Sequence, residues 1–189
     1  MKKLAQLILV CVLAITLIAS PKQPAYSQTN SPALQARATL KSTAGSRISG
    51  EVTFQQINSG FLPGVKVKAR VSGLEPNSRH GIHIHEVGTC QPDFTAAGGH
   101  FDPGPFGQSN PDSNHPFHMG DLPNLVANAQ GVATLEHITS RISLSPGPLT
   151  LFDDNGSAII IHGNEDRGTT GVQGGSGGPR SACGPIQKV

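Results

Sequence analysis

Short segments of alternating apolar and polar residues dominate the chain after about Ala38, and they constrain its fold more than any other feature. In residues 65–71, valine or alanine alternates with lysine or arginine, and residues 48–54 and 132–137 show the same period of two. Residues 157–162 add a run rich in β-branched side chains. A period of two places successive side chains on opposite faces of a β-strand. Glycine and proline separate these segments, so we expect an antiparallel β-sandwich or barrel.

The first residues of the chain have the pattern of a secretory signal. Lys2 and Lys3 precede an apolar run at residues 4–18, and a small-x-small site for cleavage lies at residues 25–27. The run is about 15 residues long, whereas a membrane-spanning helix needs about 20. A cleaved signal is therefore favoured over a retained membrane anchor.

The chain accordingly divides into three parts. We expect a signal peptide at about residues 1–27, a flexible polar leader at residues 28–37 and one folded domain at residues 38–189. The first part holds three of the 14 lysines and arginines and no acidic residue, which leaves 11 basic residues against 12 acidic ones. This near-neutral balance gives no support to nucleic-acid binding. The remaining cysteines, Cys90 and Cys183, indicate one disulfide in an oxidising compartment.

Two long segments interrupt the strand pattern. Residues 87–129 and 163–182 are rich in glycine and show no alternation, and the first also holds three of the eight histidines. Loops of this length in a compact domain are typically functional or disordered. The histidines favour a functional role for the first segment.

Candidate metal ligands gather around one short strand. His83 and His85 lie two residues apart, so their side chains point to the same face while Ile82 and Ile84 face the core. Further candidates lie in the loops and at strand ends: His100, His115, His118, Asp121 and His162. Four imidazoles suit copper, whereas three histidines with one carboxylate suit zinc. For the two remaining histidines, we expect His80 to bond to the backbone and His137 to be exposed.

Five sequence blocks resemble those of the copper/zinc superoxide dismutase family, in the family's order. They are GIHIHEVG at residues 81–88, AGGHFDP at 97–103, HMGDL at 118–122, IH at 161–162 and GSGGPRSACG at 175–184. The resemblance extends from about residue 38 to 187. It implies a Greek-key β-sandwich or barrel of about eight strands with two long functional loops, together with copper and zinc as cofactors.

The resemblance also implies the ligands of both metals. The residues that would bind copper are His83, His85, His100 and His162. The residues that would bind zinc are His100, His115, His118 and Asp121. His100 would thus bridge the two metals, and it would also carry a proton during turnover, since both nitrogens of an imidazole can bind a metal or a proton.

Further roles follow from the same resemblance. Asp166 would hydrogen-bond one copper histidine and one zinc histidine, Arg180 would attract the substrate anion, and Cys90 would pair with Cys183. The implied reaction converts two superoxide anions into dioxygen and hydrogen peroxide, as copper alternates between Cu(II) and Cu(I). The alternative is an exported copper/zinc-binding module without turnover, which would not need the cation of Arg180.

Two features depart from the family's pattern. A histidine is usual about eight residues after the bridging one, where this chain has Gln108. We expect His115 to take that place, although it could instead be a solvated loop residue. The second loop has no lysine between Gly168 and Gly178, so the attraction of superoxide would rest mainly on Arg180. We expect an exported protein, periplasmic or extracellular, and either a monomer or a homodimer.

Overall fold

The structure is a computed structural model, and it describes residues 33–59, 62–104 and 109–189. Most of the expected signal peptide and leader, together with Gln108, therefore lies outside the described residues. The strands are β1 (Gln35–Ser42), β2 (Ser49–Ser59), β3 (Leu62–Ser72), β4 (Arg79–His80), β5 (Ile82–His85), β6 (Leu125–Val126), β7 (Ala133–Thr139), β8 (Ala158–His162), β9 (Arg180–Pro185) and β10 (Gln187–Lys188). A short 3-10 helix, η1, spans Phe94–Ala97. No helix among the described residues is long and apolar enough to cross a membrane.

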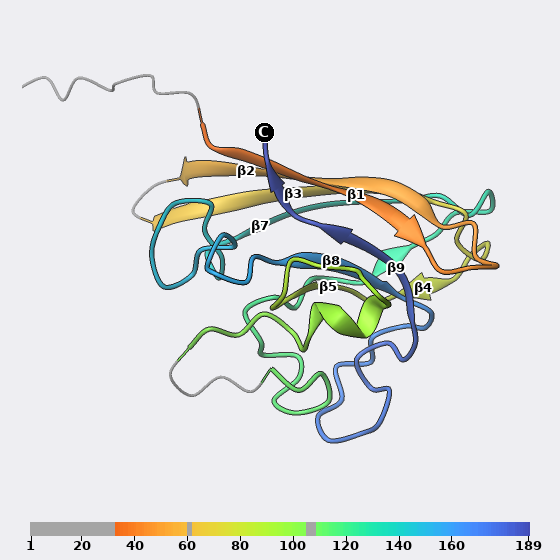
Figure 1. Cartoon of the computed structure of the whole chain (residues 1–189). Coiled ribbons are helices and arrows are strands. Elements are labelled where there is room, and N and C mark those ends of the chain that lie inside the picture. Colours follow the sequence, from red (N-terminus) through yellow and green to blue (C-terminus); the bar gives the residue numbers. More distant parts are fainter. Residues whose placement is uncertain (1–32, 60–61, 105–108) are drawn as a thin grey trace, which may run out of the picture. The chain divides into compact units, whose positions relative to one another are not determined.

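Eight of the strands form one antiparallel sheet. Its order is β5-β8-β9-β1-β2-β3-β7, and β10 pairs with β1, while β4 and β6 form a separate two-stranded sheet. The sheet curls, so that β2, β3 and β7 lie opposite β5 and β8 (Figure 1). The all-β antiparallel fold expected from the alternation is confirmed, and so is the number of about eight strands that the family resemblance implies.

The core fills the inside of this curled sheet. Alternation in β3 buries Val65, Val67 and Val71 completely, while the lysines and arginines between them face outward. On the facing part of the sheet, Ile82 and Ile84 of β5 are also fully buried, as predicted. Each such side chain contributes roughly 1.5–3 kcal/mol to stability through the apolar surface it removes from water.

The first strand begins earlier than the sequence indicates. β1 starts at Gln35, inside the segment 28–37 that was expected to be a flexible leader. Ala36 is buried and pairs with Phe54 of β2, so the inward-facing alternation continues two residues before Ala38. The end of the leader must therefore be moved toward the N-terminus.

A second, smaller apolar cluster covers the outer face of β8 and β9. Cys90 and Cys183 form a disulfide with a Cα–Cα distance of 5.9 Å, and they pack with Ala97 of η1 and Ile160 of β8. Both faces of β8 are therefore buried, which explains its continuous apolar run rather than an alternating one. The disulfide joins the first long loop to β9, as the sequence predicted.

Candidate metal centre

The edge of β5 that faces away from β8 pairs with loop residues instead of with a further strand. On one side β5 pairs with β8, and on the other side isolated bridges join His83 to Asp121 and His85 to His100. The backbone N–H of Ile84 donates to the carbonyl of Gly120 at 2.9 Å. Gly120 is required there, because a Cβ atom would lie 2.3 Å from the carbonyl oxygen of Ile84. Two segments of the first loop thereby bring their metal-binding side chains next to those of β5.

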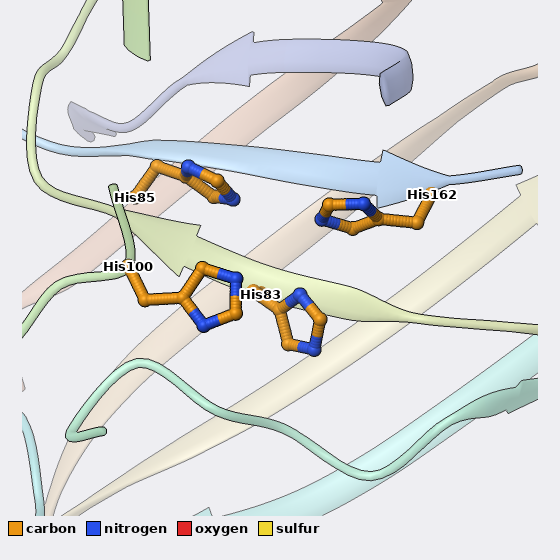
Figure 2. A group of neighbouring side chains, drawn as sticks. All are labelled: His83, His85, His100 and His162. Carbon is orange, nitrogen blue, oxygen red and sulfur yellow. The ribbon is translucent and has the colours of Figure 1, made fainter. Parts of the chain in front are cut away.

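Four histidines converge in this region (Figure 2). His83 and His85 come from β5, His162 ends β8, and His100 comes from the loop. Each offers a ring nitrogen within 4.8 Å of those of the others, and all four side chains are buried. The ring centroids of His83 and His100 are only 4.2 Å apart.

In each of these imidazoles, one nitrogen makes a hydrogen bond and the other does not. The held nitrogens and their partners are His83 Nε2 with Asp166 Oδ2 (2.9 Å), His85 Nδ1 with the Gly98 carbonyl (3.1 Å), His100 Nδ1 with Asp121 Oδ1 (2.6 Å) and His162 Nδ1 with the Gly178 carbonyl (2.9 Å). The other nitrogen of each ring is buried and has no hydrogen-bond partner among the described residues. Buried polar atoms are almost always satisfied, so four such nitrogens at one point fit a bound metal ion.

A second group of possible ligands surrounds the carboxylate of Asp121. His115 Nδ1 and His118 Nδ1 each lie 3.1 Å from Asp121 Oδ2, while His100 Nδ1 approaches Oδ1. Three imidazoles and one carboxylate are a donor set that suits tetrahedral zinc. The two nitrogens of His100 face different groups, which is the geometry that a bridging imidazole needs.

Asp166 connects the two groups. Its Oδ2 accepts a hydrogen bond from His83 Nε2 at 2.9 Å and its Oδ1 accepts one from His115 Nε2 at 2.5 Å. Such outer partners fix which nitrogen of a ligating imidazole faces the metal. Asp166 thus lies between His83 and His115, although His115 is seven residues further along the chain than Gln108.

Burial keeps three imidazoles of the four-histidine group neutral. It is the main cause that lowers the pKa of His85 and of His162 well below the usual value, and it lowers the pKa of His100 to about 4. Neutral imidazole is the form that offers a lone pair to a metal. These side chains are therefore ready to bind a cation at neutral pH without first losing a proton.

The second group has the opposite electrostatic character. Burial alone would lower the pKa of His115, but hydrogen bonds to Asp121 and Asp166 outweigh it and raise the pKa to about 9. Burial would likewise raise the pKa of both carboxyls, but hydrogen bonds from histidines, including His115, hold each well below its usual range. Two ionised carboxylates therefore attract positive charge to this point, where a dication can replace the proton on His115.

Arg180 lies beside the four-histidine group. Its Nη1 donates to the carbonyl of Phe94 and its Nη2 to that of Gly98, both at 2.6 Å. The Gly98 carbonyl also accepts from His85, so one oxygen holds a copper-type histidine and the arginine together. Arg180 and His162 line the same cavity of about 360 Å³, in which Arg180 is the one lysine or arginine among the described lining residues and Asp112 the one acidic residue.

The family of the chain follows from comparison with known proteins. Residues 48–186 match the family described as copper/zinc superoxide dismutase (SODC). The chain belongs to the copper/zinc superoxide dismutase family. Copper and zinc are therefore the metals to be placed in the two groups, and the donor sets fit them.

Similar proteins of this family come from bacteria and from animals. The chain is 34% identical over 158 residues to "Superoxide dismutase [Cu-Zn] 1" of Aquifex aeolicus, covering 82% of this chain and 88% of that protein. It is 42% identical over 130 residues to the enzyme of Caulobacter vibrioides (66% and 72%), and 36% identical over 163 residues to an extracellular enzyme of Onchocerca volvulus (82% and 76%). The crystal structure of a double mutant of a SOD-like protein from Bacillus subtilis matches with a TM-score of 0.61 at 32% identity, covering 79% of this chain and 95% of that one.

Some residues of the centre carry no signal in the sequence. Asn124 donates from Nδ2 to the Asp166 carbonyl (2.8 Å) and accepts from the Asp166 N–H (3.0 Å), which fixes the backbone of that aspartate. The two residues are far apart in sequence, and no local pattern links them.

His80 donates from Nδ1 to the His162 carbonyl, as expected. The expectation that His137 is exposed was wrong, because it is half-buried on the same face of β7 as Ala133 and Thr139.

Proposed function

We propose that this chain is a superoxide dismutase that binds copper through four histidines and converts two superoxide anions into dioxygen and hydrogen peroxide. One observation carries the proposal: His83, His85, His100 and His162 each direct a buried, unpartnered nitrogen at one point, and Arg180 stands next to it. A protein that only carried copper would have no use for a cation in a cavity beside the ligands. The family of the chain supports the same reaction.

We further propose that zinc is bound by His100, His115, His118 and Asp121. The three Nδ1 atoms around one carboxylate support this assignment. The burial of His115 and its hydrogen bond to Asp166 support it as the ligand that completes the set, rather than as a solvated loop residue. Zinc in this place would hold His100 and the first loop in position.

Bound copper, Arg180 and His100 would have different roles in the reaction. Bound copper would supply the redox step, oxidising one superoxide anion and reducing the next. Arg180 attracts the anion, since a single cation in a low-dielectric cavity concentrates negative substrate there. His100 can hold a proton at Nε2 while Nδ1 remains directed at the zinc group, and it can donate this proton as hydrogen peroxide forms, with the second proton coming from solvent.

Replacing Arg180 with glutamate is expected to lower kcat/KM by about tenfold or more, because the cation is lost and the substrate then meets a second negative charge in a cavity that Asp112 already lines. Copper content should remain at one ion per chain. The measurement is superoxide decay at several ionic strengths, with metal analysis of the same sample. Arg180→Gln should have a smaller effect, as it removes the attraction without adding repulsion. Loss of copper from both variants would instead make Arg180 a structural residue that acts through the shared Gly98 carbonyl.

We also propose that the protein is exported to the periplasm or the extracellular space. The signal-like N-terminus and the disulfide between Cys90 and Cys183 support this, and one relative is described as extracellular. Mass spectrometry of the protein recovered from each cell fraction tests it. A cytoplasmic product that retains residues 1–27 would contradict the proposal.

The experiment that tests the proposed reaction uses the purified chain loaded with copper and zinc. Superoxide removal and copper content are measured on the same preparation. We expect rapid removal in proportion to bound copper. If one copper ion is bound per chain without removal of superoxide, the protein is a metal-binding module and the proposed activity is wrong.

A further inference from the structure

The zinc group is exposed only on the side of its carboxylate. The three histidines His100, His115 and His118 are fully buried, whereas Asp121 keeps 4% of its side chain accessible. Asp166, the partner of His115, also keeps 8% of its side chain accessible. Any ion that reaches or leaves this group with little rearrangement must therefore pass the two carboxylates.

A cavity of about 350 Å³ lies on that side. Both carboxylate residues, Asp121 and Asp166, line it, together with His137 at the end of β7 and Arg141 beyond it. It has no lining residue in common with the cavity of about 360 Å³ beside His162 and Arg180. The two metal groups thus have separate approaches, and superoxide and zinc need not use the same one.

Arg141, one of the lining residues of this cavity, binds the first loop. Its Nη2 donates to the carbonyl oxygens of Phe117, at 2.5 Å, and of His118. Its own backbone N–H donates to Thr139 Oγ1 at 3.1 Å, which ties the arginine to the end of β7. The side chain therefore connects the rigid sheet to the loop residue that carries one of the zinc-type imidazoles.

We propose that this cavity is the path by which zinc enters and leaves, and that Arg141 is the positioning residue that keeps the path closed. The inference rests on the proposed zinc ligands. Opening needs only a shift of the loop around Phe117 and His118, which the two hydrogen bonds from Arg141 oppose. The copper histidines, held by Asp166, Gly98 and Gly178, need not move.

The inference predicts that zinc release becomes faster when Arg141 is replaced, whereas simple electrostatics predicts that it becomes slower. Removing a cation near a bound dication should by itself slow the loss of the dication. Arg141→Met is nevertheless expected to release zinc at least about tenfold faster, because it removes both hydrogen bonds and one bond from a charged donor already corresponds to about that factor. Arg141→Lys should restore much of the slow rate, because both bonds start from one nitrogen and an ammonium group can also supply them.

The test follows zinc transfer from the copper- and zinc-loaded protein to a chromophoric chelator, while the visible absorption of copper is recorded. Arg70→Met, which removes an exposed arginine from β3, is the matched control and should behave like the wild type. His137→Trp places a larger ring in the cavity and should slow release. General destabilisation cannot produce that result, so this variant separates a path from a merely weakened fold.

The outcomes distinguish this inference from the ligand assignment on which it rests. If the wild type binds less than one zinc ion per chain, the proposed ligands are wrong. If the wild type binds one zinc ion but Arg141→Met releases zinc at the wild-type rate, the role of Arg141 is wrong. The same holds if the variant loses copper faster by the same factor as zinc. Unchanged release from His137→Trp would show that zinc does not use this cavity.

Discussion

Replacing His83 with alanine is expected to abolish superoxide removal and to weaken copper binding by far more than about hundredfold. Loss of an outer partner of a metal ligand already costs 10–100-fold in affinity, and His83 is proposed as a ligand itself. Its ring centroid lies 4.2 Å from that of His100 and 4.8 Å from that of His162. Copper binding is measured by competition with a chelator, and activity by superoxide decay.

His137→Ala is the matched control for that variant. His137 also lies on a strand, although it is half-buried where His83 is fully buried, and it belongs to none of the groups of possible ligands among the described residues. It should keep full copper content and activity. If His83→Ala retained one tightly bound copper ion and normal turnover, the four-histidine site would be wrong.

Removing the disulfide is expected to cost about 4–5 kcal/mol of unfolding free energy on the chain-entropy model. The bond closes a segment of 93 residues, so it removes much conformational freedom from the unfolded chain. Cys90→Ala combined with Cys183→Ala avoids both a free thiol and a buried hydroxyl. Unfolding in urea measures the loss, with the reduced wild-type protein as comparison. A midpoint that equals that of the oxidised wild type would contradict the prediction.

The disulfide variant should also disturb the site beyond its effect on stability. Cys183 lies three residues after Arg180 on β9, and Cys90 lies in the loop whose Phe94 and Gly98 carbonyls hold that arginine. Without the bond, these carbonyls are held less firmly. We expect lower kcat/KM in the variant even under conditions where it is fully folded.

The parts of the centre that could be predicted are those in which local pattern decides structure. Alternation in β3 indicated which face is buried, and in β5 it indicated that Ile82 and Ile84 face the core while the rings of His83 and His85 lie on the other side of the strand. Sequence blocks around His100 and His162 then supplied the remaining copper-type ligands. Each of these inferences needs only a few neighbouring residues.

The remainder depends on contacts between segments that are far apart in sequence. The pairing of loop residues with the free edge of β5 brings Asp121 beside His83, and no local pattern indicates it. The same is true of Asn124, which orients Asp166 from another loop. Arg141 appears in the sequence only as a surface cation after a strand, and its contacts with the first loop become visible only in the fold.

The position of His115 shows how a site can tolerate a change in sequence spacing. The family's usual histidine would fall near Gln108, yet His115 Nδ1 lies beside Asp121 and its Nε2 contacts Asp166. A loop can supply the same donor atom from another position, because its backbone is not bound to a sheet register. The donor set, rather than the spacing, is what zinc requires.

The central claim is that one centre holds two metals that share His100. Anomalous diffraction from crystals of the loaded, oxidised protein, recorded at the copper and zinc absorption edges, tests it most directly. We expect copper within bonding distance of His83, His85, His100 and His162, and zinc within bonding distance of His100, His115, His118 and Asp121. Zinc without His115, or a single metal with His100 bound on one side only, would contradict the account.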